Sequence, residues 1–540
     1  MSRRARRQPP KKPPAAAPAA PGEITRREKT LWAGLLLAIY AALSTWGQFD
    51  FSDIMGYYDL HADALLRGQL HLLLGPDQVN LVDMIPYEGR YYFQWGPFPV
   101  IFHLAARAVG LRLSDRVAAL AAGWAAAVLF LEIVLLLRRR HFPEVSKGAV
   151  RWFFFAFALA TPTALVTLRG TVYNESIGIA AAAILFAFYA FLRAAEHGSV
   201  AWTAAAGCGV AAAGLSRITL LLYAGPFFLA FGALFLLRRS STRSLALKLA
   251  LLSAPIVAAG AIHAANNYAR FGSVFVFGHE YNPARATWSE GGAIRPRAFF
   301  ENFRHYFLSL PELSADFPWV AHQGWGPPIH VTRAEAVSSL ILASPFLLFG
   351  LYALPLLGRR EESVDLRLAA GLALGGAGLL FALMMSFEAA SRRYAQDFVP
   401  LLAVFAFIGL GMRARRGVDW RRLRLPARAV FAVAAAWNIH VPFYQSFYTP
   451  TPDLNVMRTF VALKPTLEAL LPDGPALDRE AAIAANDLGT TLLNRRKFPE
   501  ALDAFEKANA WLPGDPRIER NLALTRQLVT SGGRRGSRAR

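Results

Sequence analysis

A group of carboxylates lies within residues 47–95 of a chain that is otherwise poor in acids. Its seven members are Asp50, Asp53, Asp59, Asp63, Asp77, Asp83 and Glu88. Carboxylates gathered in one loop can accept protons as general bases or coordinate a cation. Asp53 stands just ahead of residues 57–67, whose helical periodicity and terminal Gly68 predict a short helix. Asp53 is therefore a candidate reactive carboxylate, and its alternative role is to cap that helix.

The elements that must position these acids are membrane-spanning helices. The chain has 540 residues, of which 54% are hydrophobic and 18% charged, and its mean hydropathy is +0.31. Soluble domains contain about 25% charged residues, so this composition indicates a polytopic membrane protein. The single cysteine, Cys208, excludes a disulfide framework and paired-cysteine metal sites. Eleven apolar runs are long enough to cross a bilayer, at 31–47, 116–137, 150–167, 177–193, 200–215, 218–237, 247–264, 335–357, 367–385, 397–412 and 427–444.

The positive charges orient these spans. Half of the 58 Lys and Arg residues fall in segments that follow an even number of crossings. Cytoplasmic loops are enriched in Lys and Arg, so these segments share the cytoplasmic side with the N-terminus. The triplet Arg138–Arg140 belongs inside only if residues 97–112 lie in the membrane interface instead of crossing it. The net charge of +21 thus reflects the Lys and Arg residues of the cytoplasmic segments, and no nucleic-acid partner is expected.

This topology places three large segments outside. The basic N-terminal tail 1–29 is predicted to be disordered and cytoplasmic, and the C-terminus to be extracytoplasmic. Within the transmembrane domain 30–446, loops 48–115 and 265–334 face outward. A linker 447–480, a helical repeat 481–530 and a basic tail 531–540 follow. An anchor alone would not need such loops, so chemistry or recognition is expected on the outer face.

The C-terminal region resembles a tetratricopeptide repeat. The matching positions are Leu488, Gly489, Leu492, Ala501, Phe505, Ala508 and Pro513. Small residues at such positions let two helices pack closely. One repeat is evident, with a further helix expected at 515–529, whereas stacks normally need about three repeats. The hairpin either binds an acceptor or a protein partner, or packs on the membrane domain.

The order of motifs in the membrane region resembles the GT-C glycosyltransferases, specifically relatives of protein O-mannosyltransferases and of lipid A aminoarabinose transferase (glycosyltransferase family 39). The likeness rests on Asp53, Tyr57, Leu65 and Gly68, on Tyr92-Phe93 with Pro97, on Tyr173-Asn174-Glu175, on Asn267–Gly272 and on Arg393–Asp397. Ile54 stands where the family usually has a second acid. The resemblance implies an all-α bundle of about eleven transmembrane helices with interfacial helices in the first outer loop.

The resemblance also implies an activity, namely transfer of a sugar from a polyprenyl-phosphate donor to an acceptor hydroxyl at the extracytoplasmic face. A phosphate leaving group needs little protonation, so one carboxylate acting as base could suffice, and a single displacement inverts the anomeric centre. Asp53 is the candidate base. Glu175 is expected as a second acid that positions the acceptor or a metal, or else as a solvated helix-terminal carboxylate.

The donor phosphate needs cations near the interface. Arg393 and Arg270 lie in the matching motifs and are candidates for binding it, or are membrane-interface anchors. Arg217 is a third candidate, because it lies at a tight turn between two spans on the same side. Asp397 is expected to pair with Arg393. The substrate-positioning candidates are Tyr57, Asp59 and Tyr92. His61 and His71 lack a third ligand, so no metal residue is assigned, no cofactor is specified and a divalent metal stays open.

Other classes remain open at this point. A secondary transporter would show matched broken spans and ionisable residues at mid-membrane, and the prolines of this chain cannot be paired in that way. A third possible class is a membrane scaffold that displays the helical hairpin. An oligosaccharyltransferase is a variant of the first class, the membrane glycosyltransferases. The expected partners of the enzyme are the lipid-linked donor, a lipid, glycan or protein acceptor, and the lipids of the plasma or inner membrane.

Overall fold

The computed structural model describes residues 23–74, 84–282, 292–314, 317, 319–321, 333–335, 339–417, 424–448, 453–470 and 475–536. Most of the predicted N-terminal tail, together with Asp77 and Asp83, lies outside these residues. The described part is helical apart from three two-stranded sheets, which confirms the expected all-α class. The first helix begins at Arg26, inside the predicted tail, because Thr25 and Glu28 form a capping box.

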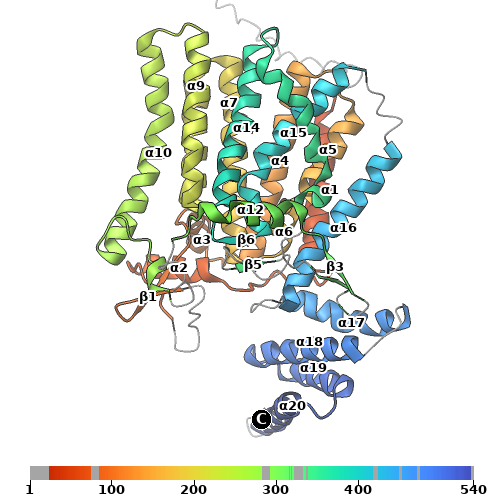
Figure 1. The fold of residues 1–540 in the computed structure, drawn as a ribbon. Helices are drawn as coiled ribbons and strands as arrows, with labels where there is room; N and C mark the ends of the chain where they lie inside the picture. Colours follow the sequence, from red (N-terminus) through yellow and green to blue (C-terminus); the bar gives the residue numbers. More distant parts are fainter. Residues whose placement is uncertain are drawn as a thin grey trace, which may run out of the picture.

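A bundle of upright helices forms the body of the molecule (Figure 1). Its elements are α1 (Arg26–Ser44), α4 (Asp115–His141), α5 (Lys147–Leu159), α6 (Pro162–Leu168), α7 (Val172–His197), α8 (Val200–Ser216), η2 (Ile218–Tyr223), α9 (Ala224–Leu237), α10 (Thr242–Phe271), α13 (Leu340–Ala343), η7 (Pro345–Gly358), α14 (Val364–Met385), α15 (Val399–Arg415) and α16 (Arg424–Tyr448). Each of the eleven expected apolar runs overlaps one helix or consecutive helices of the described residues. Among the described residues, five helices are long and apolar enough to cross a membrane, or six if the bent pair α5–α6 is one span. The count of eleven crossings stays a prediction.

Local sequence explains where the central helices begin and end. Ser114 caps α4 through Val117, and Asp115 provides an acid in its first turn. Arg138, Arg139 and Arg140 lie in its last turn, so the side chains at both ends suit the helix dipole. Close packing of α8 against α10 and α7 needs glycine. A Cβ at Gly207 would meet the backbone of α10, and one at Gly209 would meet the backbone of α7.

Shorter elements gather at the end of the bundle where α4 and α7 begin (Figure 1). They are α2 (Tyr57–Leu66), β1 (Met84–Tyr87), β2 (Arg90–Phe93), α3 (Val100–Ala108), η3 (His279–Tyr281), η5 (Pro296–Ala298), α12 (Phe299–Phe303), η6 (Arg304–Leu308), β3 (Glu312–Leu313), β4 (Val320–Ala321), β5 (Arg333–Glu335), β6 (Ala389–Ser391) and η8 (Arg392–Asp397). The expected helix 57–67 is present as α2, and Gly68 follows it with φ +69°. α3 lies within the expected interfacial segment 97–112, exposing Ile101 and Phe102 while burying His103.

Four helices extend from the same end of the bundle and carry the C-terminus (Figure 1). They are α17 (Leu454–Leu470), α18 (Pro475–Asn494), α19 (Phe498–Trp511) and α20 (Pro516–Gly536). α18 and α19 pack closely, since a Cβ at Gly489 would meet the ring of Phe505 at 2.7 Å. The expected additional helix is present as α20. α17 occupies part of the predicted linker, and the assignment as a tetratricopeptide repeat stays a prediction.

Candidate functional site

A buried histidine joins two of the acids at this end of the bundle. His103, on α3, has no exposed surface. Its Nδ1 lies 3.1 Å from Asp59 Oδ1 on α2, and its Nε2 lies 2.9 Å from Glu175 Oε1 in the first turn of α7. Glu175 is fully buried and Asp59 is 6% exposed. Three separate elements therefore meet at one imidazole ring, which excludes the solvated reading of Glu175.

A second bridge joins the same two short helices. Arg107 on α3 donates to both carboxylate oxygens of Asp63 at 2.9 and 3.1 Å, and to Asp59 Oδ2 at 3.0 Å. Asp59 and Asp63 lie four residues apart on α2, as His103 and Arg107 do on α3. Residues four apart share a helix face, so an acidic row on α2 faces a basic row on α3. This matched spacing was the sequence signal that could have identified His103.

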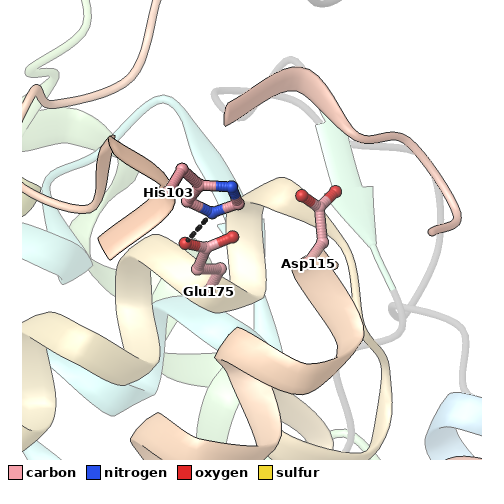
Figure 2. Close-up of side chains that lie close together, drawn as sticks. All are labelled: His103, Asp115 and Glu175. Carbon is pink, nitrogen blue, oxygen red and sulfur yellow. Dashed lines mark hydrogen bonds and ion pairs between the residues drawn. The ribbon is translucent and has the colours of Figure 1, made fainter. Parts of the chain in front are cut away.

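Asp115 completes the cluster from the first turn of α4. The side-chain donor atoms of His103, Asp115 and Glu175 all lie within 4.8 Å of one another. Figure 2 shows the three side chains converging from different elements, with Glu175 bonded to His103. Asp115 Oδ1 and Glu175 Oε2 are buried and make no hydrogen bond in the described part of the chain. One imidazole nitrogen and two such oxygens are a donor set that suits a divalent cation.

Asp53 lies beside this cluster, in the loop between α1 and α2. Its Oδ1 accepts a hydrogen bond from the backbone N–H of Asp115 at 2.7 Å. Asp115 Oδ2 in turn accepts from the backbone N–H of Gly56 at 2.9 Å. Asp53 thus caps the start of α4, whereas the sequence suggested that it caps α2, the helix that follows it in the chain. Its Oδ2 makes no hydrogen bond among those of the described residues and is not buried from solvent, so it can meet a substrate.

Burial and neighbouring charges set the protonation of Asp53 and His103. Burial raises the pKa of Asp53, and the neighbouring charge of Asp59 adds to that rise against the opposing Asp115 N–H bond. Burial alone would lower the pKa of His103, but the hydrogen bond and charge of Glu175, followed by Asp59, raise it to about 9. His103 is therefore an imidazolium at neutral pH in the protein without metal, and a cation bound there would displace its proton.

Two arginines flank one tyrosine beside the acidic cluster. The guanidinium of Arg217 lies 5.4 Å from the Tyr394 ring, and that of Arg393 lies at the same distance from it. Arg217 donates to Asp397 Oδ2 at 2.8 Å, so Asp397 pairs with Arg217 instead of the expected Arg393. The Asp397 side chain is only 1% exposed, so this ion pair is buried on its acidic side. The structure therefore brings two of the three phosphate-binding candidates together.

Aromatic rings connect these cations to the acids. Arg393 also lies over the ring of Tyr173, at 4.8 Å. Tyr173 packs against Trp95 at 5.1 Å, and Trp95 packs against Tyr57 at 6.3 Å. Tyr57 begins α2, four residues after Asp53. A continuous line of side chains thus runs from the Asp53 loop to the arginine pair.

The remaining candidates occupy a neighbouring region. Arg270, near the end of α10, donates to the Phe93 carbonyl at 2.7 Å and to Asn267 Oδ1 at 3.0 Å, which ties α10 to β2. Tyr92 packs on Phe271 and on His71. His61 is buried against Phe93, and burial together with the charge of Arg270 lowers its pKa to about 4. The group of potential metal ligands found among the described residues includes neither His61 nor His71.

The chain is an all-α polytopic membrane protein. One end of its helix bundle carries buried acidic side chains and two arginines that flank one tyrosine ring. No protein-family model matches it, and no curated protein matches it. Its structure is similar to that of ArnT from Cupriavidus metallidurans bound to undecaprenyl phosphate, at 14% identity and a TM-score of 0.46, covering 93% of this chain and 78% of that one. It is also similar to the oligosaccharyltransferase of Archaeoglobus fulgidus, at 17% identity and a TM-score of 0.42, covering 83% of this chain.

A second structure of that oligosaccharyltransferase, in complex with Zn and sulfate, gives 15% identity and a TM-score of 0.44. This chain spans 59% of the length of the first oligosaccharyltransferase chain and 56% of the second. At these identities and scores the similarity carries no conclusion about activity, so the activity has to be argued from the residues of this chain.

Proposed function

We propose that this protein is an integral membrane glycosyltransferase of GT-C type. It transfers a sugar from a polyprenyl-phosphate donor to an acceptor hydroxyl at the extracytoplasmic face, with inversion of the anomeric centre. The observation that carries the proposal is a cluster connected through aromatic rings to Arg217 and Arg393. In this cluster the partly buried Asp53 lies beside four buried side chains, those of Asp59, His103, Asp115 and Glu175. A base and a phosphate-binding pair are the two parts that such a transfer requires.

The charges at the two ends of α4 support the extracytoplasmic location. Asp115 opens this helix at the cluster, and Arg138, Arg139 and Arg140 close it at the opposite end. A cluster of arginines at the end of a span marks the cytoplasmic side. The acidic cluster then faces outward, where the sugar donor is carried by a lipid and not by a nucleotide. The N-terminus is cytoplasmic and the C-terminal helices extracytoplasmic in this arrangement.

Asp53 acts as the base in the proposed transfer. Its Oδ2 takes the proton of the acceptor hydroxyl while the hydroxyl oxygen forms a bond to the anomeric carbon of the donor. The bond from that carbon to the phosphate oxygen breaks, and the phosphate leaves with the electron pair. One displacement of this kind inverts the anomeric centre. The Asp115 N–H bond to Oδ1 holds the carboxylate so that Oδ2 faces the acceptor.

Arg217 and Arg393 neutralise the departing phosphate. Arginine is well suited to this role, because its planar guanidinium donates two parallel hydrogen bonds to a phosphate. The Nε of Arg217 is buried and makes no hydrogen bond within the described residues. Trp95 and Tyr173 line the path between these cations and Asp53 and provide apolar faces for the sugar ring. Tyr57 and Asp59 position the substrates from α2.

A divalent cation fits the acidic cluster. His103, Asp115 and Glu175 would hold it, since two of their carboxylate oxygens lack other partners. A bound cation would supply positive charge for substrate oxygens. The similar ArnT structure has bound undecaprenyl phosphate, and the similar oligosaccharyltransferase structure is a complex with Zn and sulfate. For this chain, a lipid-linked donor and an acceptor hydroxyl are the proposed partners.

The deciding experiment is an assay of the purified protein, in detergent or liposomes, with a panel of radiolabelled polyprenyl-phosphate sugars. We expect release of the polyprenyl phosphate with at least one sugar in the presence of acceptor membranes, and no release with the Asp53→Asn variant. Absence of release across the whole panel, with a folded wild-type protein, would contradict the proposal.

A further inference from the structure

We infer that α17 is a positioning element of the candidate site, which holds the Asp53 loop from the side of the C-terminal helices. The inference rests on the proposed function only in taking the acidic cluster as the working site. The positioning residues are Asn455, Arg458 and Thr459. They lie more than 400 residues from Asp53 in the chain.

Several hydrogen bonds attach the Asp53 loop, the segment between α1 and α2, to the beginning of α17. Asn455 Nδ2 donates to the Asp50 carbonyl at 2.7 Å, and Arg458 donates to Asp50 Oδ2 at 3.0 Å. Thr459 Oγ1 donates to the Trp46 carbonyl at 2.9 Å and accepts from Gln48 Nε2 at 3.1 Å. Every one of these bonds joins the first two turns of α17 to the segment directly before Asp53.

A buried ion pair anchors the start of α17 next to Asp115. Arg116 donates to both carboxylate oxygens of Asp453, at 2.9 and 3.1 Å, and both side chains are 2% exposed. Arg116 also donates to the Ser44 carbonyl at the end of α1. The residue before α17 therefore contacts α4 directly beside its cluster acid. A bidentate pair of this kind fixes geometry in addition to charge.

The Asp53 loop adopts a backbone conformation that needs such support. Trp46 has φ +50° and Phe49 has φ +53°, values that L side chains rarely adopt, and Gly47 between them has φ +76°. Residues in this region cost free energy and persist only where surrounding contacts impose the conformation. The bonds of Thr459 and Asn455 reach the carbonyls of this strained stretch. Without them the loop would relax and Asp53 would move.

The C-terminal helices also reach the loop beyond α17. Arg495, directly after α18, donates to Ser52 Oγ at 3.2 Å and to the Asp53 carbonyl at 3.3 Å. The Trp46 ring packs on Phe443 of α16 at 5.4 Å, and Phe443 packs on Phe460 of α17. The loop is thus enclosed between α16 and the C-terminal helices. Any event that shifts α17 is transmitted to Asp53.

The test uses the full-length protein carrying Arg458→Ala with Thr459→Val, which removes three of these hydrogen bonds and leaves the buried Asp453 pair intact. We expect backbone amides 46–53 to exchange with solvent at least about tenfold faster, since each bond contributes to the local opening free energy. Exchange in α4 and α7 should not change. The rate constant of sugar transfer should fall, while the KM for the donor should stay at the wild-type value.

Two further variants show whether the effect is specific. Arg458→Lys with Thr459→Ser keeps the charge and the hydroxyl, so both exchange and transfer should return most of the way to wild type. Lys507→Ala removes an exposed pair with Asp503 on α19 and should change neither quantity. Exchange at 46–53 within twofold of wild type in the first variant would overturn the inference. If wild-type protein transfers no sugar at all, the proposed function fails, while the exchange measurement still decides the role of α17.

Discussion

Asp53 and Asp115 are joined by a backbone hydrogen bond, and a second bond runs from the Asp53 loop back to Asp115 through Gly56. Asp53 Oδ1 accepts from the N–H of Asp115 at 2.7 Å, and Asp115 Oδ2 accepts from the N–H of Gly56 at 2.9 Å. The two carboxylates are therefore held close without a direct bond between them. Each keeps one oxygen outside this arrangement, and those oxygens are the ones to which we assign proton transfer and cation binding.

Asp53→Asn separates the catalytic role of Asp53 from its structural role. Asparagine keeps an Oδ1 that accepts the Asp115 N–H, so α4 should retain its cap and the protein its fold. It cannot accept the proton of the acceptor, and loss of a general base lowers rates by about 10²–10⁴-fold. We expect transfer to fall by that factor, with an unchanged melting temperature.

Glu88→Gln is the matched control for this change. Glu88 lies in the same outer segment but is exposed in the turn between β1 and β2. Its variant should transfer sugar at the wild-type rate. Near-normal turnover of Asp53→Asn, under conditions where the wild type is active, would remove Asp53 as the base.

Binding of a divalent cation should depend on the acids of the cluster. We expect Mn²⁺ to raise the melting temperature of the EDTA-treated protein, because a ligand bound only to the folded state stabilises it. Asp115→Asn and Glu175→Gln should each abolish that rise. Glu361→Gln, at an exposed acid between η7 and α14, should retain it. A Mn²⁺ effect equal in all four proteins would place the ion elsewhere.

Arg217→Ala should weaken binding of a polyprenyl phosphate that carries no sugar. Hydrogen bonds to a charged group contribute about 1.5–3 kcal/mol each, so we expect about ten- to a hundredfold weaker binding in a tryptophan-fluorescence titration. Arg393→Ala should have a comparable effect. Arg270→Ala breaks the bond to the Phe93 carbonyl instead, so it should lower stability more than affinity. Equal losses of affinity in all three variants would mean that Arg270 also reaches the phosphate.

The positions of the helices along the chain could be predicted from the sequence, because the length of an apolar run is a local property. The helix at 57–67, its end near Gly68 and a short helix within 97–112 follow from local sequence in the same way. The pairing of Asp59 with His103 was not predicted, because it depends on how α2 and α3 face each other.

Two other parts of the site depend on contacts between distant segments. Asp115 follows Ser114 and looks in the sequence like an ordinary acid in the first turn of a helix, so its position beside Asp53 and Glu175 had no local signal. The pair of Arg116 with Asp453 joins residues 337 positions apart. No spacing rule reaches that far, which is why the support of the Asp53 loop by α17 was missed.

His61 should make the protein less stable in mild acid. Burial, with the nearby charges of Arg270 and His103, lowers the pKa of His61 in the folded state to about 4, whereas an unfolded histidine has a pKa of about 6.5. Between these values the unfolded chain binds the proton and the folded one does not, so stability falls as the pH drops below 6.5. At pH 5 the difference amounts to about 2 kcal/mol, and at pH 7.5 it vanishes. We therefore expect the drop in melting temperature from pH 7.5 to pH 5 to be a few degrees larger in the wild type than in His61→Gln.

His197→Gln is the control, since His197 is half exposed at the end of α7, and it should show the wild-type drop. An equal drop in wild type and His61→Gln would mean that His61 is protonated inside the folded protein.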